Sequence, residues 1–407
     1  MDKSGIIDAL AQVVVGAGLR TERGDLVVVD GAPIHRDFML AAARECWARG
    51  ARHVYLRYYD DRAFRDRVDR EAEEWLDTMP RALESFYKAF ADEGWSRLMV
   101  VGDEDPSFME GADPGRLQRV NAAHHRAFTP LSNLAMSFTI PWCVVPYPTD
   151  AWARLVQASP DAMAEALWPE LLKAMRIDGP SEEGPRTHFD ALAERARILD
   201  SLHLESLEFS GPGTALTIGL SSRSRWMGGT VTAPGGRSFT PNIPTEEVYT
   251  TPDFRRTEGH VACSRPVVVL DTIVEGAWLE FKGGVVVASG ASRNAEVLDR
   301  NLAIDQGARR LGEVALVDCS SPIWTSGRLF RNILLDENAA CHIALGHGIA
   351  STFEGAGRLD AEAREAAGYN DSSEHSDLMI GSDRVDVTGW MVGGGEVALI
   401  REGRFVI

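Results

Sequence analysis

Short apolar runs alternate with longer segments of helical periodicity through the first 150 residues. The apolar runs are Leu26–Val29, Val54–Tyr58, Leu98–Val101 and Trp142–Val145. Each is separated from the next by a segment of more than ten residues whose apolar positions recur at helical spacing. Strands joined by crossover helices pair in parallel. The pattern therefore predicts a doubly wound α/β layer with a parallel sheet.

The pattern changes near residue 210. From Asp150 to Glu208 it is helical and strongly charged, with proline breaks that are typical of a packed connector. The run Ser210–Gly213 then interrupts both helical and strand periodicity. We therefore expect two domains, residues 1–210 and residues 211–407.

The second part of the chain combines short β-type runs, many glycines and two segments of helical spacing. The predicted strands are Ala215–Leu220, Val267–Leu270, Trp278–Phe281, Val285–Val287, Val314–Val317, Leu378–Ile380, Gly389–Val392 and Val397–Ile400. The predicted helices are Asn294–Leu311 and Glu337–Leu345. The predicted fold class is thus α/β, with an N-terminal doubly wound parallel-sheet domain and a C-terminal α/β or α+β domain.

Composition and charge narrow the class of protein. The 407 residues include 42 Lys and Arg against 60 Asp and Glu, and the net charge of −18 disfavours binding to nucleic acid or anionic lipid. No run approaches the roughly 18 consecutive apolar residues of a membrane span. We expect a globular protein that binds neither nucleic acid nor membranes.

The cysteines and the N-terminus indicate a cytoplasmic protein. The five cysteines are widely separated and form no CxxC pair, which argues against a disulfide framework and a structural zinc knuckle. Asp2 and Asp8 make the N-terminal segment read as an amphipathic helix rather than a signal peptide. The turn at Asp30 lacks G-x-G-x-x-G spacing, so we expect no nucleotide cofactor.

Carboxylates are concentrated in two segments of the second domain. A proline-fixed loop carries Glu246 and Glu247 side by side. Glu313 lies between the end of a predicted helix and an apolar strand, a position that tends to bury its carboxylate. Because an unpaired buried carboxylate is costly, this position favours a bound cation.

Two histidine segments complete the set. His342 lies in the predicted helix among small and apolar residues. His375 and Asp377 are two residues apart at the start of a predicted strand, so their side chains point to the same side. Such an H-x-D pair is suited to bind one metal ion.

Each feature also has an ordinary structural interpretation. His342 is consistent with a hydrogen-bonded core residue, the H-x-D pair with a surface strand end, and Glu247 with a solvated loop residue. Glu313 is consistent with an ion pair to Arg309 or Arg310. Together, however, three carboxylates and two imidazoles match the oxygen and nitrogen ligands of a two-zinc or two-cobalt hydrolytic site.

Four blocks carry these residues: NIPTEEVYTTP, LGEVALV, DENAACHIALG and NDSSEHSDLMIGS. In order and approximate spacing they closely resemble the metal-site blocks of the M29 family of metalloaminopeptidases, the thermophilic aminopeptidase T group. GARHVYLRYYDD and VVPYPTDAWARLV extend the resemblance to the first domain. It therefore covers essentially the whole chain.

This resemblance implies an enzyme that removes the N-terminal residue of short peptides through a metal-activated water. It implies two divalent ions, zinc or cobalt with manganese and magnesium as further candidates, and a homodimer with active sites facing an internal cavity. The implied metal ligands are Glu247, Glu313, His342, His375 and Asp377, with Glu313 bridging the ions and so taking part in catalysis.

The general acid or base is left open between Glu246 and Glu337. Glu246 is adjacent to Glu247, and Glu337 lies at the start of the predicted helix around His342. A solvent-facing loop carboxylate and a helix-start carboxylate are the ordinary alternatives for these two residues.

One position departs from the pattern of the resembled family. Its members usually carry a tyrosine seven residues after the histidine of the predicted helix, where this chain has Ile349. Loss of the phenol would weaken one metal position or leave a site for a single metal ion. His347 is either a substitute ligand or an ordinary helix C-terminal residue. A single Fe(II) bound by His342, His375 and Asp377 would instead suit a 2,5-dihydroxypyridine-type ring-cleaving dioxygenase. A non-catalytic binding relative is the third alternative.

Overall fold

The structure is a computed structural model in which residues 1–270 and 272–407 are described. The chain divides into two compact units. Unit 1 comprises Met1–Thr187 and Thr230–Ile243, and unit 2 comprises His188–Gly229 and Pro244–Ile407. Helix α8 (Glu183–Ser201) begins in unit 1 and ends in unit 2. Among the described residues, no helix is long and apolar enough to cross a bilayer.

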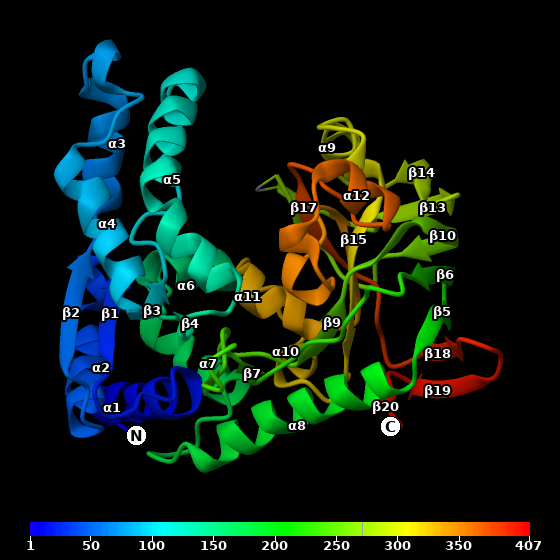
Figure 1. The fold of residues 1–407 in the computed structure, drawn as a ribbon, viewed down its shortest axis with the longest axis horizontal. Helices are drawn as coiled ribbons and strands as arrows, with labels where there is room; N and C mark the ends of the chain where they lie inside the picture. Colours follow the sequence, from blue (N-terminus) through cyan, green and yellow to red (C-terminus); the bar gives the residue numbers. More distant parts are fainter. Residues whose placement is uncertain (271) are drawn as a thin grey trace. The chain divides into compact units, whose positions relative to one another are not determined.

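Unit 1 contains a four-stranded parallel sheet with the strand order β2-β1-β3-β4 (Figure 1). Its strands are β1 (Leu26–Gly31), β2 (His53–Tyr58), β3 (Ser96–Val101) and β4 (Trp142–Pro146). These strands coincide with the four apolar runs of the first 150 residues. The predicted parallel α/β layer is therefore confirmed.

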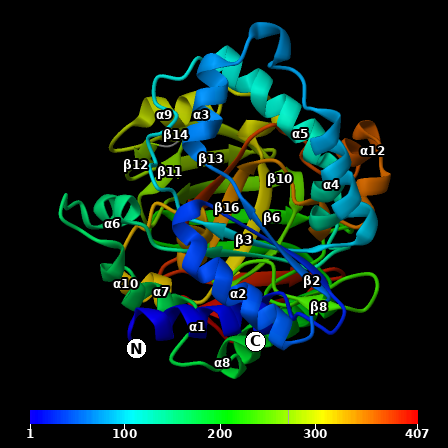
Figure 2. The ribbon, with the colours of Figure 1, turned by 90° about the vertical axis from the view of Figure 1, so that its left-hand side faces the viewer.

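Helices supply the crossovers that a parallel sheet requires. The crossover helices are α2 (Arg36–Ala48), α3 (Asp61–Arg70), α4 (Arg81–Glu93) and α5 (Pro114–Met136). Helix α1 (Lys3–Val13) precedes the first strand, and α6 (Asp150–Gln157) and α7 (Trp168–Ala174) follow the last. Val28 of β1 packs in one cluster with Phe90 of α4 and Leu131 of α5. Helices α4 and α5 lie side by side in both views (Figures 1 and 2). A small hairpin of β7 (Val231–Thr232) and β8 (Ser238–Phe239) also belongs to this unit.

Unit 2 contains two antiparallel sheets. The larger has the order β14-β13-β10-β6-β5-β18-β19-β20 and the smaller has the order β17-β16-β15-β9. The larger sheet consists of β5 (Leu204–Gly211), β6 (Thr214–Leu220), β10 (Pro252–Ala262), β13 (Trp278–Lys282), β14 (Val285–Gly290), β18 (Asp386–Met391), β19 (Glu396–Arg401) and β20 (Arg404–Phe405). The smaller consists of β9 (Glu247–Thr250), β15 (Leu311–Val317), β16 (His342–Gly346) and β17 (His375–Met379).

Short elements complete unit 2. They are the pair β11 (Val267–Val269) and β12 (Thr272–Val274), and the helices α9 (Ala295–Asn301), α10 (Pro322–Ser326), α11 (Ile333–Asp336) and α12 (Ala361–Ala366). One hydrophobic cluster contains apolar residues of the eight-stranded sheet, such as Phe209 and Ile218, and of the four-stranded sheet, such as Leu316 and Ile343. The core of unit 2 therefore lies between the two sheets.

The predicted helix Glu337–Leu345 is wrong. Only a 3₁₀ turn is present over Glu337–Ala339, and the following residues form strand β16. Every residue of β16 is buried, and a short run that is apolar on both sides has no periodicity to separate a strand from a helix. The predicted helix Asn294–Leu311 is also too long, because α9 ends at Asn301 and β15 begins at Leu311.

The expected domain boundary lies in a hairpin. Ser210–Gly213 falls at the turn between β5 and β6, where Gly211 pairs with Thr214. The compact units instead divide the chain between Thr187 and His188 and assign residues 230–243 to unit 1. The division into domains at residue 210 stays a prediction, because a compact unit need not fold on its own.

His35 connects the carboxyl ends of two parallel strands in unit 1. Its Nδ1 accepts a hydrogen bond from the Ala32 amide (3.1 Å), and its Nε2 donates to the Gly102 carbonyl (2.9 Å). Burial lowers the pKa of His35 to about 4, and the hydrogen bond to Gly102 opposes this only in part. The folded protein therefore keeps this imidazole neutral in one tautomer.

This pKa shift predicts a specific loss of stability in mild acid. Between pH 6.5 and about 4 the unfolded chain binds a proton at His35 that the folded protein does not, so stability falls as the pH falls. The loss should approach about 3 kcal/mol at pH 4. Urea unfolding at several pH values should show that His35→Gln removes this part of the pH dependence. The exposed His53→Gln serves as the control, and an unchanged pH dependence in His35→Gln would contradict the assignment.

Candidate metal centre

The five predicted metal ligands lie on one face of the four-stranded sheet. Residues paired directly across antiparallel strands, and residues two apart on one strand, point to the same side. The pairs are Val317–Glu247, Ala315–His342, Glu313–Ala344, Ala344–Asp377 and Gly346–His375. We call the side that carries Glu247, Glu313, His342, His375 and Asp377 the front face.

The opposite side, the back face, is apolar. Val248, Val314, Leu316, Ile343 and Leu378 alternate with the front-face residues and are fully buried in the hydrophobic cluster of unit 2. A shift of one residue in strand register would exchange the two faces and place carboxylates in this core. The apolar back face therefore enforces the register that gathers the polar residues in front.

A β-bulge at Gly312 turns Glu313 toward the front face. Leu311 pairs with Leu345 whereas Glu313 pairs with Ala344, so two steps along β15 match one step along β16. As a result, Leu311 lies in the back-face cluster and Glu313 lies in front. A Cβ atom on Gly312 would lie 2.2 Å and 2.3 Å from two backbone oxygen atoms, so only glycine fits.

Glu313 presents one carboxylate oxygen to each of two groups. Its Oε1 lies 3.9 Å from His342 Nε2, which lies 3.3 Å from Glu247 Oε2. Its Oε2 lies 3.3 Å from His375 Nε2, which lies 3.5 Å from Asp377 Oδ1. Within each group, the ligand atoms all lie within 4.8 Å of one another. The arrangement could hold two ions with Glu313 shared between them.

Backbone carbonyls orient both imidazoles. His342 Nδ1 donates to the Ala340 carbonyl (3.2 Å), and His375 Nδ1 donates to the His347 carbonyl (2.9 Å). Each hydrogen bond places the proton of a neutral imidazole on Nδ1 and leaves Nε2 as an electron-pair donor aimed at the carboxylates. Both histidines are thus held in the tautomer that binds a metal through Nε2.

Glu247 fits a bound cation particularly well. Its side chain is buried, and its Oε2 has no hydrogen-bond partner among the described residues. Burial and the nearby Glu313 and Asp377 raise the pKa of Glu247 to about 8, although His342 opposes this. A buried carboxylate with an unused acceptor requires a proton or a cation, and this one faces two further carboxylates.

His375 and Asp377 behave as a strongly coupled pair. Burial lowers the pKa of His375, but hydrogen bonds and charges from Asp377 and Glu313 outweigh it and raise the value to about 12. Burial raises the pKa of Asp377, but His375 outweighs it and holds the value below the ordinary one. The group therefore favours a positive charge at the imidazole Nε2, which a metal ion can supply.

The two candidate acids or bases occupy different surroundings. Glu246 lies outside both ligand groups, with its Oε1 3.4 Å from His188 Nε2 and its amide donating to Asn338 Oδ1 (2.6 Å). Glu337 follows α11, and its pKa is raised well above the ordinary value by burial and by Glu247, Asp377 and Glu313. Glu337 is therefore electrostatically coupled to the front-face carboxylates.

His347 is part of neither ligand group among the described residues. Its Nδ1 donates to the Ser372 carbonyl (2.9 Å), and its Nε2 lies 3.3 Å from the hydroxyl of Tyr369. It follows strand β16, so the interpretation as a helix C-terminal residue is wrong. Its contribution to the site is the backbone carbonyl that accepts from His375.

The sequence alone does not point to Gly312, Tyr249 or Asn370. Asn370 Nδ2 donates to the carbonyls of Gly346 (2.5 Å) and Gly307 (2.9 Å) and so ties the start of the NDSS block to β16. Tyr249 shares the front face with Glu247 because the two residues are two apart on β9. Recognising it requires the strand assignment of β9, which a proline-containing loop obscures.

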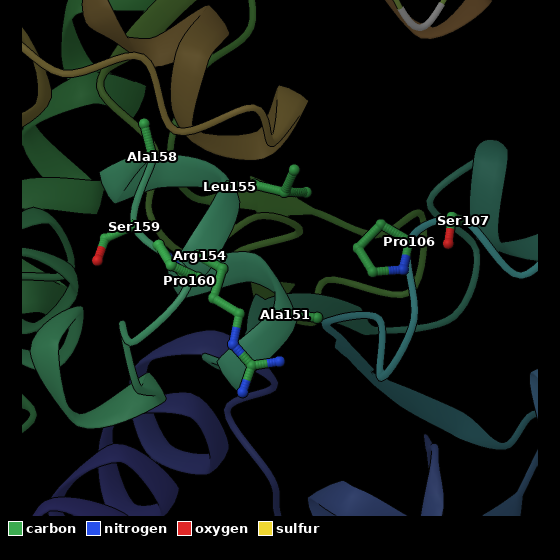
Figure 3. A pocket seen from close by; sticks show the side chains of 8 residues that line it. All are labelled: Pro106, Ser107, Ala151, Arg154, Leu155, Ala158, Ser159 and Pro160. Carbon is green, nitrogen blue, oxygen red and sulfur yellow. The ribbon is translucent and has the colours of Figure 1, made fainter.

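A pocket of about 360 Å³ in unit 1 has a different character (Figure 3). It is lined by Pro106, Ser107, Ala151, Arg154, Leu155, Ala158, Ser159 and Pro160. This lining offers one guanidinium and no carboxylate, imidazole or thiol. It therefore lacks the donor types that bind a divalent ion.

Comparisons with known proteins agree with this geometry. A family model described as "Thermophilic metalloprotease (M29)" matches residues 4–405. Aminopeptidase T of Thermus aquaticus is 40% identical over 409 residues, which cover 98% of each chain. Aminopeptidase PepS of Streptococcus thermophilus is 33% identical, again over 98% of each chain. The solved structure of wild-type AmpT from Thermus thermophilus is 35% identical, covers 99% of each chain and superposes with a TM-score of 0.87.

Gly312→Ala should weaken metal binding by forcing the bulge to shift. The added methyl group would lie 2.2 Å from the His347 carbonyl oxygen, which accepts the hydrogen bond of His375. Displacing that acceptor should reduce affinity for Zn²⁺ or Co²⁺ by about 10- to 100-fold, as with other residues that orient ligands. Competition with a fluorescent chelator measures this affinity. Gly357→Ala is the control because no atom lies within 4 Å of its added Cβ; equal affinities in both variants would contradict the role of the bulge.

Proposed function

Because the chain belongs to the thermophilic metalloprotease family M29, we propose that the front face is the active site of this enzyme. The chain is a metal-dependent aminopeptidase, because its family is one of metalloproteases and its full-length relatives are named as aminopeptidases. In the proposal, Glu247, Glu313 and His342 hold one divalent ion, and Glu313, His375 and Asp377 hold a second. The proposed metals are zinc or cobalt, with manganese and magnesium as alternatives.

The observation that carries this proposal is the position of Glu313. Its two oxygens face different imidazoles, one in each group, while its side chain is almost completely buried. Glu313 therefore lies between the two ligand groups and contributes one carboxylate oxygen to each. Oxygen and nitrogen donors without thiolates are the set that hydrolytic two-metal sites use.

Two divalent ions held by these five side chains would supply an activated water and polarise a peptide carbonyl. Hydrolysis then forms one C–O bond from the water oxygen and breaks the C–N bond, and the leaving amine takes a proton from the water. The residues of this chain hold the ligand atoms apart at fixed distances and keep both imidazoles in the required tautomer.

We assign the proton transfer to Glu337 in preference to Glu246. Glu337 interacts electrostatically with three front-face carboxylates, which together with burial raise its pKa well above the ordinary value, and a raised pKa suits a carboxyl group that accepts and returns a proton. Glu246 faces His188 instead. In this role Glu337 takes a proton from the attacking water and later gives one to the leaving amine.

The proposal includes short peptides as substrates, a cytoplasmic location and a homodimer. Aminopeptidase names of the relatives support a peptide substrate. All five cysteines are free thiols, which supports a reducing compartment. The same names give no support to the iron dioxygenase or to the non-catalytic relative, and we do not propose either.

Removal of the shared carboxylate should abolish both metal binding and activity. Glu313→Ala should lower kcat/KM on an aminoacyl p-nitroanilide by at least about 1000-fold, because about 4 kcal/mol of metal-dependent stabilisation is lost. A chelator should have the same effect on the wild type, and Co²⁺ or Zn²⁺ should restore only the wild type. Elemental analysis should show about two ions per wild-type chain.

Glu280→Ala on β13 is the matched control, since this glutamate is exposed on the larger sheet. It should keep wild-type activity and metal content. A Glu313→Ala protein that binds as much metal as the wild type would refute the shared role of Glu313. An inactive wild type across a panel of free-amine peptides would refute the front face as a peptidase site.

A further inference from the structure

Tyr249 stands on the front face beside the ligand groups. It lies two residues after Glu247 on β9, so both side chains point to the same side of the sheet. It pairs with Ala315 of β15, and Ala315 pairs on its other side with His342 of β16. Tyr249 and His342 are thus two strand spacings apart, about 10 Å between backbones, across a single alanine.

Small residues separate Tyr249 from the opposite ligands. Ala315 and Ala344 occupy the inner positions of the front face on β15 and β16. Their side chains are single methyl groups, so the longer side chains of Tyr249, Glu247 and Glu313 extend beyond them. A peptide carbonyl brought to the ligand groups would be bordered by the phenol ring of Tyr249.

The hydroxyl of Tyr249 is an unused hydrogen-bond donor. Its backbone amide and carbonyl bond to Met227, but its phenol has no hydrogen-bond partner among the described residues. Because Tyr249 is only half-buried, this hydroxyl is open to an acceptor from outside the protein. Substrate or water can supply that acceptor.

The other polar groups of the front face do not have a free proton to offer. Glu247, Glu313 and Asp377 are acceptors when ionised. His342 and His375 use their Nδ1 protons on backbone carbonyls and direct Nε2 at the carboxylates. Among the front-face side chains of β9, β15, β16 and β17, Tyr249 is therefore the one donor whose proton is available to a ligand.

We propose that the Tyr249 phenol donates a hydrogen bond to the carbonyl oxygen of the scissile peptide bond and is a catalytic residue of the peptidase. This proposal rests on the proposed function of the front face. When the water oxygen adds to the carbonyl carbon, the C=O electron pair moves to the oxygen, and a fixed O–H donor stabilises the charge that develops there. When the C–N bond breaks, the pair returns and the amine leaves with a proton from the water. Tyr249 keeps its own proton throughout.

The proposal predicts that Tyr249→Phe lowers kcat by about 10- to 1000-fold on an aminoacyl p-nitroanilide, the effect of removing one such donor. KM and the amount of bound metal should stay within twofold of the wild type, and the thermal midpoint should not change, because the ring and all five ligands remain. The affinity for an aminophosphonic acid, which mimics the tetrahedral state, should fall by a similar factor. The affinity for the free amino acid product should change by less than threefold.

Two further variants make the outcomes distinct. Tyr55→Phe removes an exposed phenol on β2 of unit 1 and should behave as the wild type. Glu313→Ala reports on the proposed function itself. If Glu313→Ala is inactive while Tyr249→Phe keeps wild-type kcat and aminophosphonate affinity, the role of Tyr249 is refuted and the active site stands. If both keep wild-type activity, the proposed active site is refuted as well. Loss of bound metal in Tyr249→Phe would also overturn the proposal, because it would show that Tyr249 positions the metal ligands and does not act on the substrate.

Discussion

Three carboxylates that share one buried patch of sheet set the central constraint on this protein. Ionised carboxylates with little access to water are unfavourable unless positive charge stands among them. The two imidazoles supply part of that charge, and the unused Oε2 of Glu247 shows that the patch has capacity for more. Divalent ions bound at this patch would supply the positive charge that its buried carboxylates need.

The four-stranded sheet meets this constraint through the two-residue alternation of β-strands. One side of β9, β15, β16 and β17 contributes apolar residues to the core, and the other side gathers the acids and imidazoles. Alternation alone would have placed Glu313 on the same side as Leu311. The bulge at Gly312 provides the exception, and the close approach of two backbone oxygen atoms explains why a glycine occupies it.

Local patterns in the sequence predict part of this structure. The four parallel strands of unit 1 and the strand that begins at His375 follow from short apolar runs and two-residue spacing. The ligand set depends on a resemblance to known blocks, because no local rule joins Glu247 to Glu313 across the sheet. The sequence predicts a helix around His342 where the structure has β16, because this strand is short and apolar on both sides. Tyr249 and Gly312 escape prediction for a related reason: their roles depend on strand register, which is set by contacts distant along the chain.

The most direct test of the account is anomalous diffraction at the zinc or cobalt absorption edge from crystals grown with that metal. The account predicts two ion peaks per chain, one among Glu247, Glu313 and His342 and one among Glu313, His375 and Asp377. A single peak at saturating metal, or peaks that none of these five side chains contact, would contradict it.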